Sequence, residues 1–525
     1  MDIGVEVSHH VRLRAGVRPG FAAGRDTGSG SMTPDVPAWA RDAVFYQVFP
    51  DRFASSTRVE DPGPMEPWTA PPTVHGFKGG DLLGIAERID ELVDLGVTAL
   101  YLNPIFTAAS NHRYNASDLM SVDPLLGGES AFRELLDVAH GKGIRVVLDG
   151  VLNHAGRGFW PFQHVIEAGG QSPYRDWFYL DDDVLQGRRG VQHQDHLCPE
   201  SGPRGYRSWW DVPALPKLRI EHHPVREYLL TAVEHWTRSG IDGWRLDVPE
   251  DIEDPTFWPE FRQRVRAINP EAYLLGEIWH EAPDWLTGDR FDALMNYPLT
   301  MAILGFVGGH RIARDVIVGQ SNYRDGLVDL DANAFSELLT RNMTLNGPEV
   351  TAVQFNLLGS HDSPRARSVL GEELDLVRLA TTLQLALPGT PSIYYGDEIG
   401  MSGGTDPDCR RAYPGHLEDV DSAGLAHREF VRSLIRARRT EAALRLGTVR
   451  VAGTSGRAVA IERRSGDRRA LILVNAGDEP VGLDLGDGAG DRLRHLVEVS
   501  TGSVAVDNGG SRAQMGARSA VVLVE

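Results

Sequence analysis

The chain has 525 residues, of which 42% are hydrophobic and 24% are charged, close to the ordinary composition of a globular protein. This composition argues against a disordered, fibrous or membrane-embedded chain. The 53 basic and 73 acidic residues give a net charge of −20, which disfavours a nucleic acid as the main partner and suits a neutral ligand. The two cysteines imply no disulfide framework.

The amino-terminal segment shows no continuous apolar stretch of the kind found in secretory signals, and no later run is long enough to cross a membrane. A Gly/Ser-rich stretch just before Met32 is typical of a linker. We therefore expect residues 1–39 to form a flexible leader, and we expect the protein to be cytoplasmic with no membrane partner.

Short apolar runs rich in β-forming residues then alternate with amphipathic helical patterns, as in consecutive β–α units. Three of the helical patterns, at 82–95, 130–140 and 225–239, end near glycines. Eight strands with parallel crossovers predict an α/β fold, a closed (β/α)8 TIM barrel. The predicted strands are 44–49, 97–104, 144–150, 241–248, 272–279, 291–298, 352–358 and 391–398.

Two segments stand apart from the barrel pattern. The stretch between the third and fourth strands is too long for an ordinary loop, so we predict an inserted subdomain B that overhangs the barrel mouth. After about Leu446 the sequence changes to short alternating runs without helical pattern, which predicts a C-terminal antiparallel β-sandwich. The expected divisions are barrel 40–154, subdomain B 155–224, barrel 225–441 with the catalytic site, and sandwich 442–525.

Acidic residues stand at the carboxyl ends of several strands, where barrel enzymes carry their active sites. Side chains alternate along a strand, so Arg245 and Asp247 share a face, and the guanidinium would keep Asp247 ionised. Glu277 ends the next strand. Two carboxylates on neighbouring strands can flank one bond as retaining glycoside hydrolysis requires, Asp247 attacking and Glu277 protonating the leaving oxygen.

Other strand-end groups can serve the same sugar ring. Asp362 could bind hydroxyls and favour a cationic transition state, with His154 and His361 donating hydrogen bonds. A single strand-end acid could equally be a helix cap or part of a structural ion pair, but acids at four strand ends make that reading weak.

The segments "DGVLNH" (149–154), "GWRLD" (243–247), "GEIWH" (276–280) and "LLGSHD" (357–362) resemble the signature segments of the α-amylase superfamily, glycoside hydrolase family 13. The resemblance implies Asp247 as nucleophile, Glu277 as general acid/base and Asp362 as transition-state stabiliser. The substrate-binding residues that it implies are Tyr114, Asp149, His154, Arg245, Trp279, His361, Asp406 and Arg410, with Tyr114 as the aromatic platform under the attacked glucose.

Other segments, such as "SWWDVPALPKL" and "GGTDPDCRR", look most like the cyclomaltodextrinase, neopullulanase and maltodextrin-hydrolase branch. The N-terminal β-sandwich of that branch has no counterpart before the barrel. "VPED" stands where the branch often has a "VANE"-like segment. "RRAYPG" lacks the tryptophan often found at its end, so we expect the outer glucose contacts to differ. Monomer and homodimer both stay open.

A few other residues are candidates for metal binding or sugar stacking, and each has a plainer interpretation. The cluster of His193, Asp195, His196 and Cys198 fits no zinc template, so no metal residue is predicted. No cofactor is expected to be required, although by family analogy calcium is left as an option near Asp51 or Asn153. Trp209, Trp210 and Trp279 could stack on sugars, but tryptophans more often belong to a core.

The predicted function is hydrolysis of α-1,4 bonds, with α-1,6 bonds as an option, in maltodextrins, starch-derived oligosaccharides or cyclodextrins. The partner is thus an α-glucan oligosaccharide. The close alternative is a transglycosylase or isomerase using the same residues. A non-catalytic sugar-binding homologue is the third interpretation, and it is disfavoured because such homologues typically lose one of the three acids, all present here.

Overall fold

The computed structural model describes residues 35–191, 204–485, 494–500, 503–507 and 511–525, so most of the expected leader lies outside the described residues. Eight parallel strands form one sheet in the order β8-β7-β6-β5-β2-β1-β10-β9. A parallel bridge between Met295 and Phe355 joins the two edges of the sheet, and the barrel closes. The predicted (β/α)8 barrel is therefore confirmed. Its strands are β1 (Phe45–Val48), β2 (Ala99–Leu102), β5 (Arg145–Gly150), β6 (Gly243–Leu246), β7 (Tyr273–Gly276), β8 (Ala293–Leu294), β9 (Phe355–Leu357) and β10 (Thr390–Tyr394).

The interior of the barrel is a packed core. Phe45, Tyr101, Tyr273 and Phe355 are fully buried there among smaller apolar residues. Trp39 packs against Phe45 and Tyr273, with ring centroids 6.0 and 5.9 Å away, and its indole donates a hydrogen bond to the Glu271 carbonyl. Phe45, Tyr273 and Phe355 are the first residues of their strands, so apolar side chains fill the amino-terminal end of the barrel. The polar residues gather at the other end, where the strands have their carboxyl ends.

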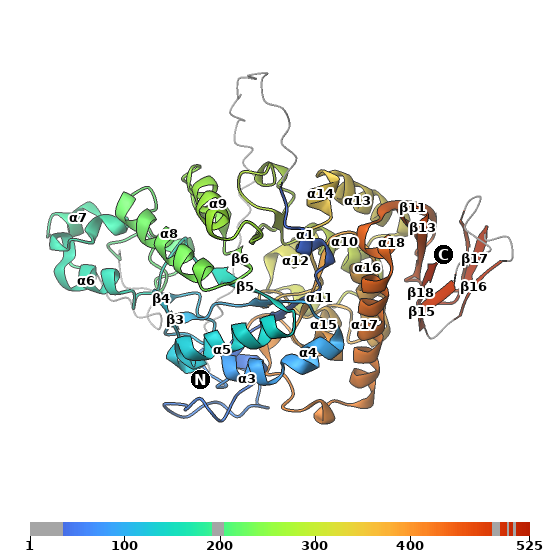
Figure 1. Ribbon diagram of the computed structural model, residues 1–525, viewed down its shortest axis with the longest axis horizontal. Helices are drawn as coiled ribbons and strands as arrows, with labels where there is room; N and C mark the ends of the chain where they lie inside the picture. The colour runs from blue at the N-terminus through green and yellow to red at the C-terminus, as the bar shows by residue number, and fades with distance from the viewer. Residues whose placement is uncertain (1–34, 192–203, 486–493, 501–502, 508–510) are drawn as a thin grey trace, which may run out of the picture.

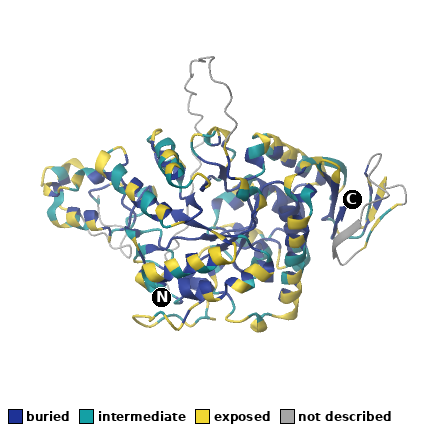
Figure 2. Ribbon diagram, viewed as in Figure 1, coloured by how far each residue is buried: buried dark blue, intermediate teal, exposed yellow. Residues whose placement is uncertain are grey.

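Helices surround the sheet, with their inner faces buried and their outer faces exposed (Figures 1 and 2). The prediction of one helix at 82–95 is wrong in one respect: the structure has two helices there, separated at Arg88. The predicted glycine ends are confirmed: Gly96, Gly143 and Gly240 have positive φ, which glycine adopts without strain. The helices are α1 (Ala38–Asp42), α2 (Pro50–Phe53), α3 (Leu82–Glu87), α4 (Ile89–Leu95), α5 (Gly128–Gly141), α8 (His223–Arg238), α9 (Phe257–Ile268), α10 (Tyr297–Gly308), α11 (Arg314–Ile317), α12 (Ser321–Gly326), α13 (Ala332–Thr344), α14 (Pro348–Thr351), α15 (Ala366–Val369), α16 (Leu374–Ala386), α17 (Ser422–Thr440) and α18 (Ala442–Leu446).

Two insertions extend from the barrel. A hairpin of β3 (Phe106–Ala108) and β4 (Ala116–Val122) follows β2, and the sequence patterns did not predict it. The longer insertion after β5 carries the helices α6 (Trp160–Ala168) and α7 (Asp182–Leu185) and the 3-10 turn η4 (Trp209–Asp211). In Figure 1, α6 and α7 lie at the end of the molecule opposite the C-terminal strands.

The C-terminal part forms two antiparallel sheets, β11-β12-β13-β18-β15 and β14-β17-β16, which share an apolar core. The predicted C-terminal antiparallel β-structure is confirmed. Buried Arg463 ties this part to the barrel, because it donates to the Ala386 carbonyl at the end of α16. The strands are β11 (Thr448–Ser455), β12 (Ala458–Ser465), β13 (Arg468–Asn475), β14 (Val481–Asp484), β15 (Arg494–Ser500), β16 (Val504–Val506), β17 (Arg512–Met515) and β18 (Ser519–Val524).

Among the described residues, no helix combines the length and the apolar character needed to cross a lipid bilayer.

Candidate active site

Arg245 lies at the centre of a buried cluster of carboxylates. It lies in β6, one residue before the end of the strand, and none of it is exposed. Its Nη1 donates to Asp149 at 2.9 Å and to Asp247 at 3.0 Å, and its Nη2 lies 2.9 Å from Glu277. The structure thus brings Asp247 and Glu277 to one guanidinium; the strand alternation predicted the contact with Asp247 but not the one with Glu277.

The charges of this cluster do not balance, because one guanidinium faces three carboxylates. Burial raises the pKa of Asp247 well above its usual value and also raises that of Glu277, while Arg245 opposes both shifts. Neighbouring carboxylates raise both pKa values further: Glu277 raises that of Asp247, and Asp362 raises that of Glu277. The expectation that the guanidinium would keep Asp247 ionised is therefore not met in the direction of the shift, because burial and the neighbouring carboxylates outweigh Arg245.

The backbone and an indole fix the Glu277 carboxyl group. The Val248 N–H donates to its Oε2 at 3.2 Å, and the Trp279 indole N–H donates to its Oε1 at 3.2 Å. Trp279 in turn stacks on buried Tyr297 with ring centroids 3.6 Å apart. Val248 has a φ of 37°, a strained conformation for a β-branched residue. The strain occurs directly after Asp247, where the chain must turn to present that N–H.

A second carboxylate centre lies after β9. Asp362 is 2.9 Å from His361 Nε2, and it accepts a hydrogen bond from Arg410 Nη2 at 3.2 Å. Arg410 Nη1 also lies 2.9 Å from Asp406. Burial alone would raise the pKa of Asp362, but His361 and Arg410 together hold it well below its usual range. The shift favours the anionic form of Asp362, opposite in direction to the shifts of Asp247 and Glu277.

Tyr114 connects the two centres. Its hydroxyl donates to Asp149 at 2.7 Å, and its ring stacks on His361 at 5.2 Å with an interplanar angle of 3°. Asp149 also accepts a hydrogen bond from the Tyr101 hydroxyl at 2.6 Å, and it is almost fully buried. Asp149 therefore contacts both Tyr114 and Arg245 and orients their side chains.

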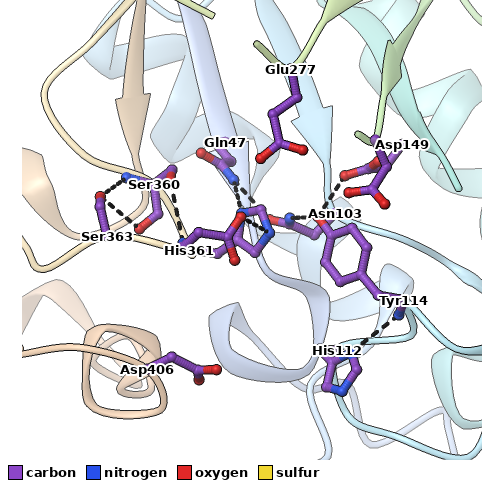
Figure 3. A network of polar contacts seen from close by, with 12 residues as sticks. Gln47, Asn103, His112, Tyr114, Asp149, Glu277, Ser360, His361, Ser363 and Asp406 are labelled. Carbon is purple, nitrogen blue, oxygen red and sulfur yellow. Dashed lines mark hydrogen bonds and ion pairs between the residues drawn. The ribbon is translucent and has the colours of Figure 1, made fainter. Parts of the chain in front are cut away.

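Figure 3 shows further polar residues that the sequence patterns did not single out. Buried Gln47, at β1, contacts His361 Nδ1 and donates to Asn103, both at 3.0 Å. Asn103, just after β2, donates to the Tyr114 hydroxyl at 2.9 Å. His112 accepts from the Tyr114 N–H at 3.2 Å. A polar residue at the carboxyl end of an otherwise apolar strand was the available signal for Gln47 and Asn103.

His154 is enclosed by protein. Its Nε2 lies 3.2 Å from the Tyr114 carbonyl oxygen, and its ring lies flat against Trp209, with centroids 4.9 Å apart. Burial lowers the pKa of both His154 and His112 to about 3, so both imidazoles are neutral near pH 7. A neutral imidazole can orient Tyr114 without adding a charge to the cluster.

The positions where calcium was left as an option do not fit that ion. Asn153 Oδ1 accepts from the Lys217 ammonium, which also donates to the Asp251 carbonyl oxygen. Burial lowers the pKa of Lys217 to about 8, so it still carries its charge near pH 7. The Asp51 carboxylate lies 2.9 Å from the Arg52 guanidinium and accepts the Lys78 N–H at 3.0 Å. At both positions a protein cation already faces the oxygen ligands.

Dialysis against EDTA is therefore expected to leave the Tm unchanged, whereas Lys217→Ala is expected to lower the free energy of unfolding by about 1–3 kcal/mol. The variant leaves two buried acceptors, on Asn153 and Asp251, without their donor. Thermal unfolding with EDTA and with added calcium measures both effects. A Tm that falls in EDTA and returns with calcium would contradict this interpretation.

The residues of the rejected zinc cluster, 193–198, lie outside the described residues. Within the described part of the chain, no three His, Cys, Asp or Glu side chains group as metal ligands.

Comparisons with known proteins agree with the geometry. Residues 47–435 match the catalytic domain of α-amylase. Cyclomaltodextrinase from a Bacillus species is 40% identical over 472 residues, 89% of this chain and 77% of that protein. Neopullulanase 2 from Thermoactinomyces vulgaris is 41% identical over 417 residues, 79% of this chain and 66% of that protein. The crystal structure of an acarbose-soaked debranching enzyme from Nostoc punctiforme has a TM-score of 0.82 at 37% identity, covering 94% of this chain and 100% of that one.

Proposed function

Because the chain belongs to the α-amylase family, we propose that this α-glucan hydrolase cleaves α-1,4 bonds of maltodextrins with retention of configuration at the anomeric carbon. The observation that carries the proposal is the placing of Asp247 and Glu277 on one buried guanidinium. The resemblance to this family drawn from the motifs is confirmed. The roles of single residues are part of the proposal.

In the first step, an Asp247 oxygen attacks the anomeric carbon while Glu277 gives its proton to the glycosidic oxygen, and the leaving sugar departs. In the second step, the Glu277 carboxylate takes a proton from water as that water attacks the same carbon and releases Asp247. Arg245 stabilises the Asp247 anion. Burial raises the pKa of Glu277 and also that of Asp247, so the roles of the two groups are taken from the resemblance of the motifs and not from these shifts.

The remaining residues bind and orient the sugar in this proposal. Tyr114 stacks on the attacked glucose, and the Asp362 anion favours the positive charge that develops at the ring. Asp406, whose side chain is 44% exposed beside Arg410, is placed to bind the neighbouring glucose. Asp149, His154 and Trp279 act as positioning residues.

Cleavage of α-1,6 bonds and of cyclic dextrins extends the proposal. It draws on the names of the relatives, a cyclomaltodextrinase, a neopullulanase and a debranching enzyme. These names do not favour the transglycosylase or isomerase alternative. The cytoplasmic location and the oligomeric state stay predictions that cell fractionation and light scattering would test.

Incubation with maltotriose, soluble starch and a cyclodextrin is expected to give maltose and glucose, whereas pullulan is expected to give a trisaccharide that keeps one α-1,6 bond, and trehalose is tested separately. The first-formed reducing sugar is expected to be the α-anomer, observable by proton NMR before it mutarotates. A β-anomer would mean single displacement and would remove Asp247 as a nucleophile.

A further inference from the structure

The polar residues around Asp362 come from two separate loops. His361 and Asp362 lie in the loop after β9, whereas Asp406 and Arg410 lie in the loop after β10. Figure 3 shows Asp406 on a different segment from His361. Arg410 joins the two loops, because its Nε donates to the His361 carbonyl oxygen at 2.8 Å and its Nη2 donates to Asp362 at 3.2 Å. The place of Arg410 therefore depends on how the second loop is held against the first.

Arg365 holds both ends of the second loop. It is the residue directly before α15, and its side chain is fully buried. Its backbone N–H donates to the Gly403 carbonyl oxygen at 3.0 Å, and its Nε donates to the Cys409 carbonyl oxygen, also at 3.0 Å. The segment that carries Asp406 is thus closed at both ends on one residue. Arg410 follows this segment directly.

The buried guanidinium of Arg365 has partners that match its shape and its charge. Its Nη1 donates to the Tyr395 carbonyl oxygen at 2.8 Å and to Asp397 Oδ1 at 2.9 Å. Its Cζ lies over the rings of Tyr394 and Tyr395, 4.4 and 4.9 Å from their centroids. Only a planar group with several donors in fixed directions meets these acceptors together, so a lysine ammonium cannot replace it.

Arg410 transmits the position of this loop to two acids. Its Nη2 faces Asp362, and its Nη1 lies 2.9 Å from Asp406. The Cys409 thiol also donates to the His361 carbonyl oxygen, at 3.2 Å. A shift of the Cys409 backbone would therefore move Arg410 away from the loop after β9.

We propose that Arg365 is a positioning residue, which sets the place of Arg410 against Asp362 and Asp406 without touching the sugar itself. A misplacement of about 1 Å in a group that binds the substrate can cost about 100-fold in rate. The inference rests on the proposed function. It adds a residue that lies three positions beyond the "LLGSHD" segment and that no strand end marks.

The test is a double-variant cycle of Arg365→Lys and Arg410→Ala, read as kcat/KM on maltotriose. Each single variant is expected to lower kcat/KM by about 100-fold. The double variant is expected to stay within about threefold of Arg410→Ala alone, because Arg365 acts through the side chain that this variant has already lost. Two independent losses would instead multiply.

Arg438→Lys is the matched control. Arg438 is also buried, and its Nη1 donates to the Leu385 and Leu387 carbonyl oxygens at 2.8 and 2.9 Å. Both carbonyls lie just before β10, at the amino-terminal end of the barrel, opposite the site. The control variant is expected to lower the Tm as Arg365→Lys does and to keep the parent kcat/KM.

The outcomes separate this inference from the proposed function. If the unsubstituted chain does not cleave maltotriose, the proposed function fails and the inference fails with it. If the chain is active but Arg365→Lys keeps its rate, or the two losses multiply, only the inference is wrong. Should Arg365→Lys not fold, Asp397→Asn takes its place, because it removes the charge that faces the guanidinium. Its loss is expected to be about tenfold in the parent and absent in Arg410→Ala, and any other pattern overturns the inference.

Discussion

Replacing Asp247 with asparagine is expected to lower kcat on maltotriose by about 10⁴-fold or more, because an amide cannot form the glycosyl-enzyme. Arg245 stays paired with Asp149 and Glu277, so the fold and the sugar contacts are retained. Substrate affinity is expected to change little. Product release followed over days measures the residual rate, and calorimetric titration with maltotriose measures the affinity.

Asp284→Asn is the matched control for this experiment. It makes the same carboxylate-to-amide change at an exposed position in the loop after β7, and it is expected to keep the parent rate. If Asp247→Asn turns over within about tenfold of the parent, the nucleophile has been assigned to the wrong residue. Loss of turnover together with loss of binding would indicate a disturbed site, which the Tm would reveal.

The barrel could be predicted from the sequence because its signals are local. A run such as 144–150 is apolar, β-branched and bounded by turn residues, and it folds as β5 within one residue of the prediction. β8 has only two residues, Ala293–Leu294, because its ladder continues as a single bridge at Met295. The hairpin of β3 and β4 lacks such a signal and was not predicted, since β3 has only three residues and β4 mixes buried apolar residues with partly buried polar ones.

The candidate site could be predicted only in part, for a similar reason. Strand-end position marks Asp149, Arg245 and Asp247 from the sequence alone, because the period of a strand fixes which side chains share a face. The contact between Gln47 and His361 joins positions 314 residues apart, and no local pattern reports it. The ammonium of Lys217 beside Asn153 is also a tertiary contact, which is why calcium stayed open until the fold was known.

The pairing of Arg245 explains how two similar carboxyls take different roles. The guanidinium contacts Asp149, Asp247 and Glu277, so with all three ionised the buried cluster would carry an excess of negative charge. One retained proton lowers that cost. Asp149 accepts hydrogen bonds from two tyrosines and from Arg245. Attack by Asp247 requires that Glu277 hold the proton.

Glu277→Gln is therefore expected to lower kcat on maltotriose by about 10³-fold and to remove the alkaline limb of the pH profile. In the parent, activity needs the protonated Glu277, so kcat/KM falls as pH rises through the raised pKa of that group. A glutamine does not titrate, and the limb should disappear. The loss in kcat/KM, which reports the first step, should be much smaller for a nitrophenyl α-maltoside, because its leaving group departs without a proton. Initial rates across the pH range on both substrates measure the difference.

Azide provides the decisive check on this role. With Glu277→Gln the glycosyl-enzyme lacks its base for activating water, so azide should accelerate turnover and give α-maltosyl azide, because the second attack restores the original configuration. Glu281→Gln is the control, since it alters a carboxyl in the same loop that pairs with Arg341. Equal losses on maltotriose and the nitrophenyl substrate, without azide rescue, would mean that Glu277 positions its neighbours instead of transferring the proton.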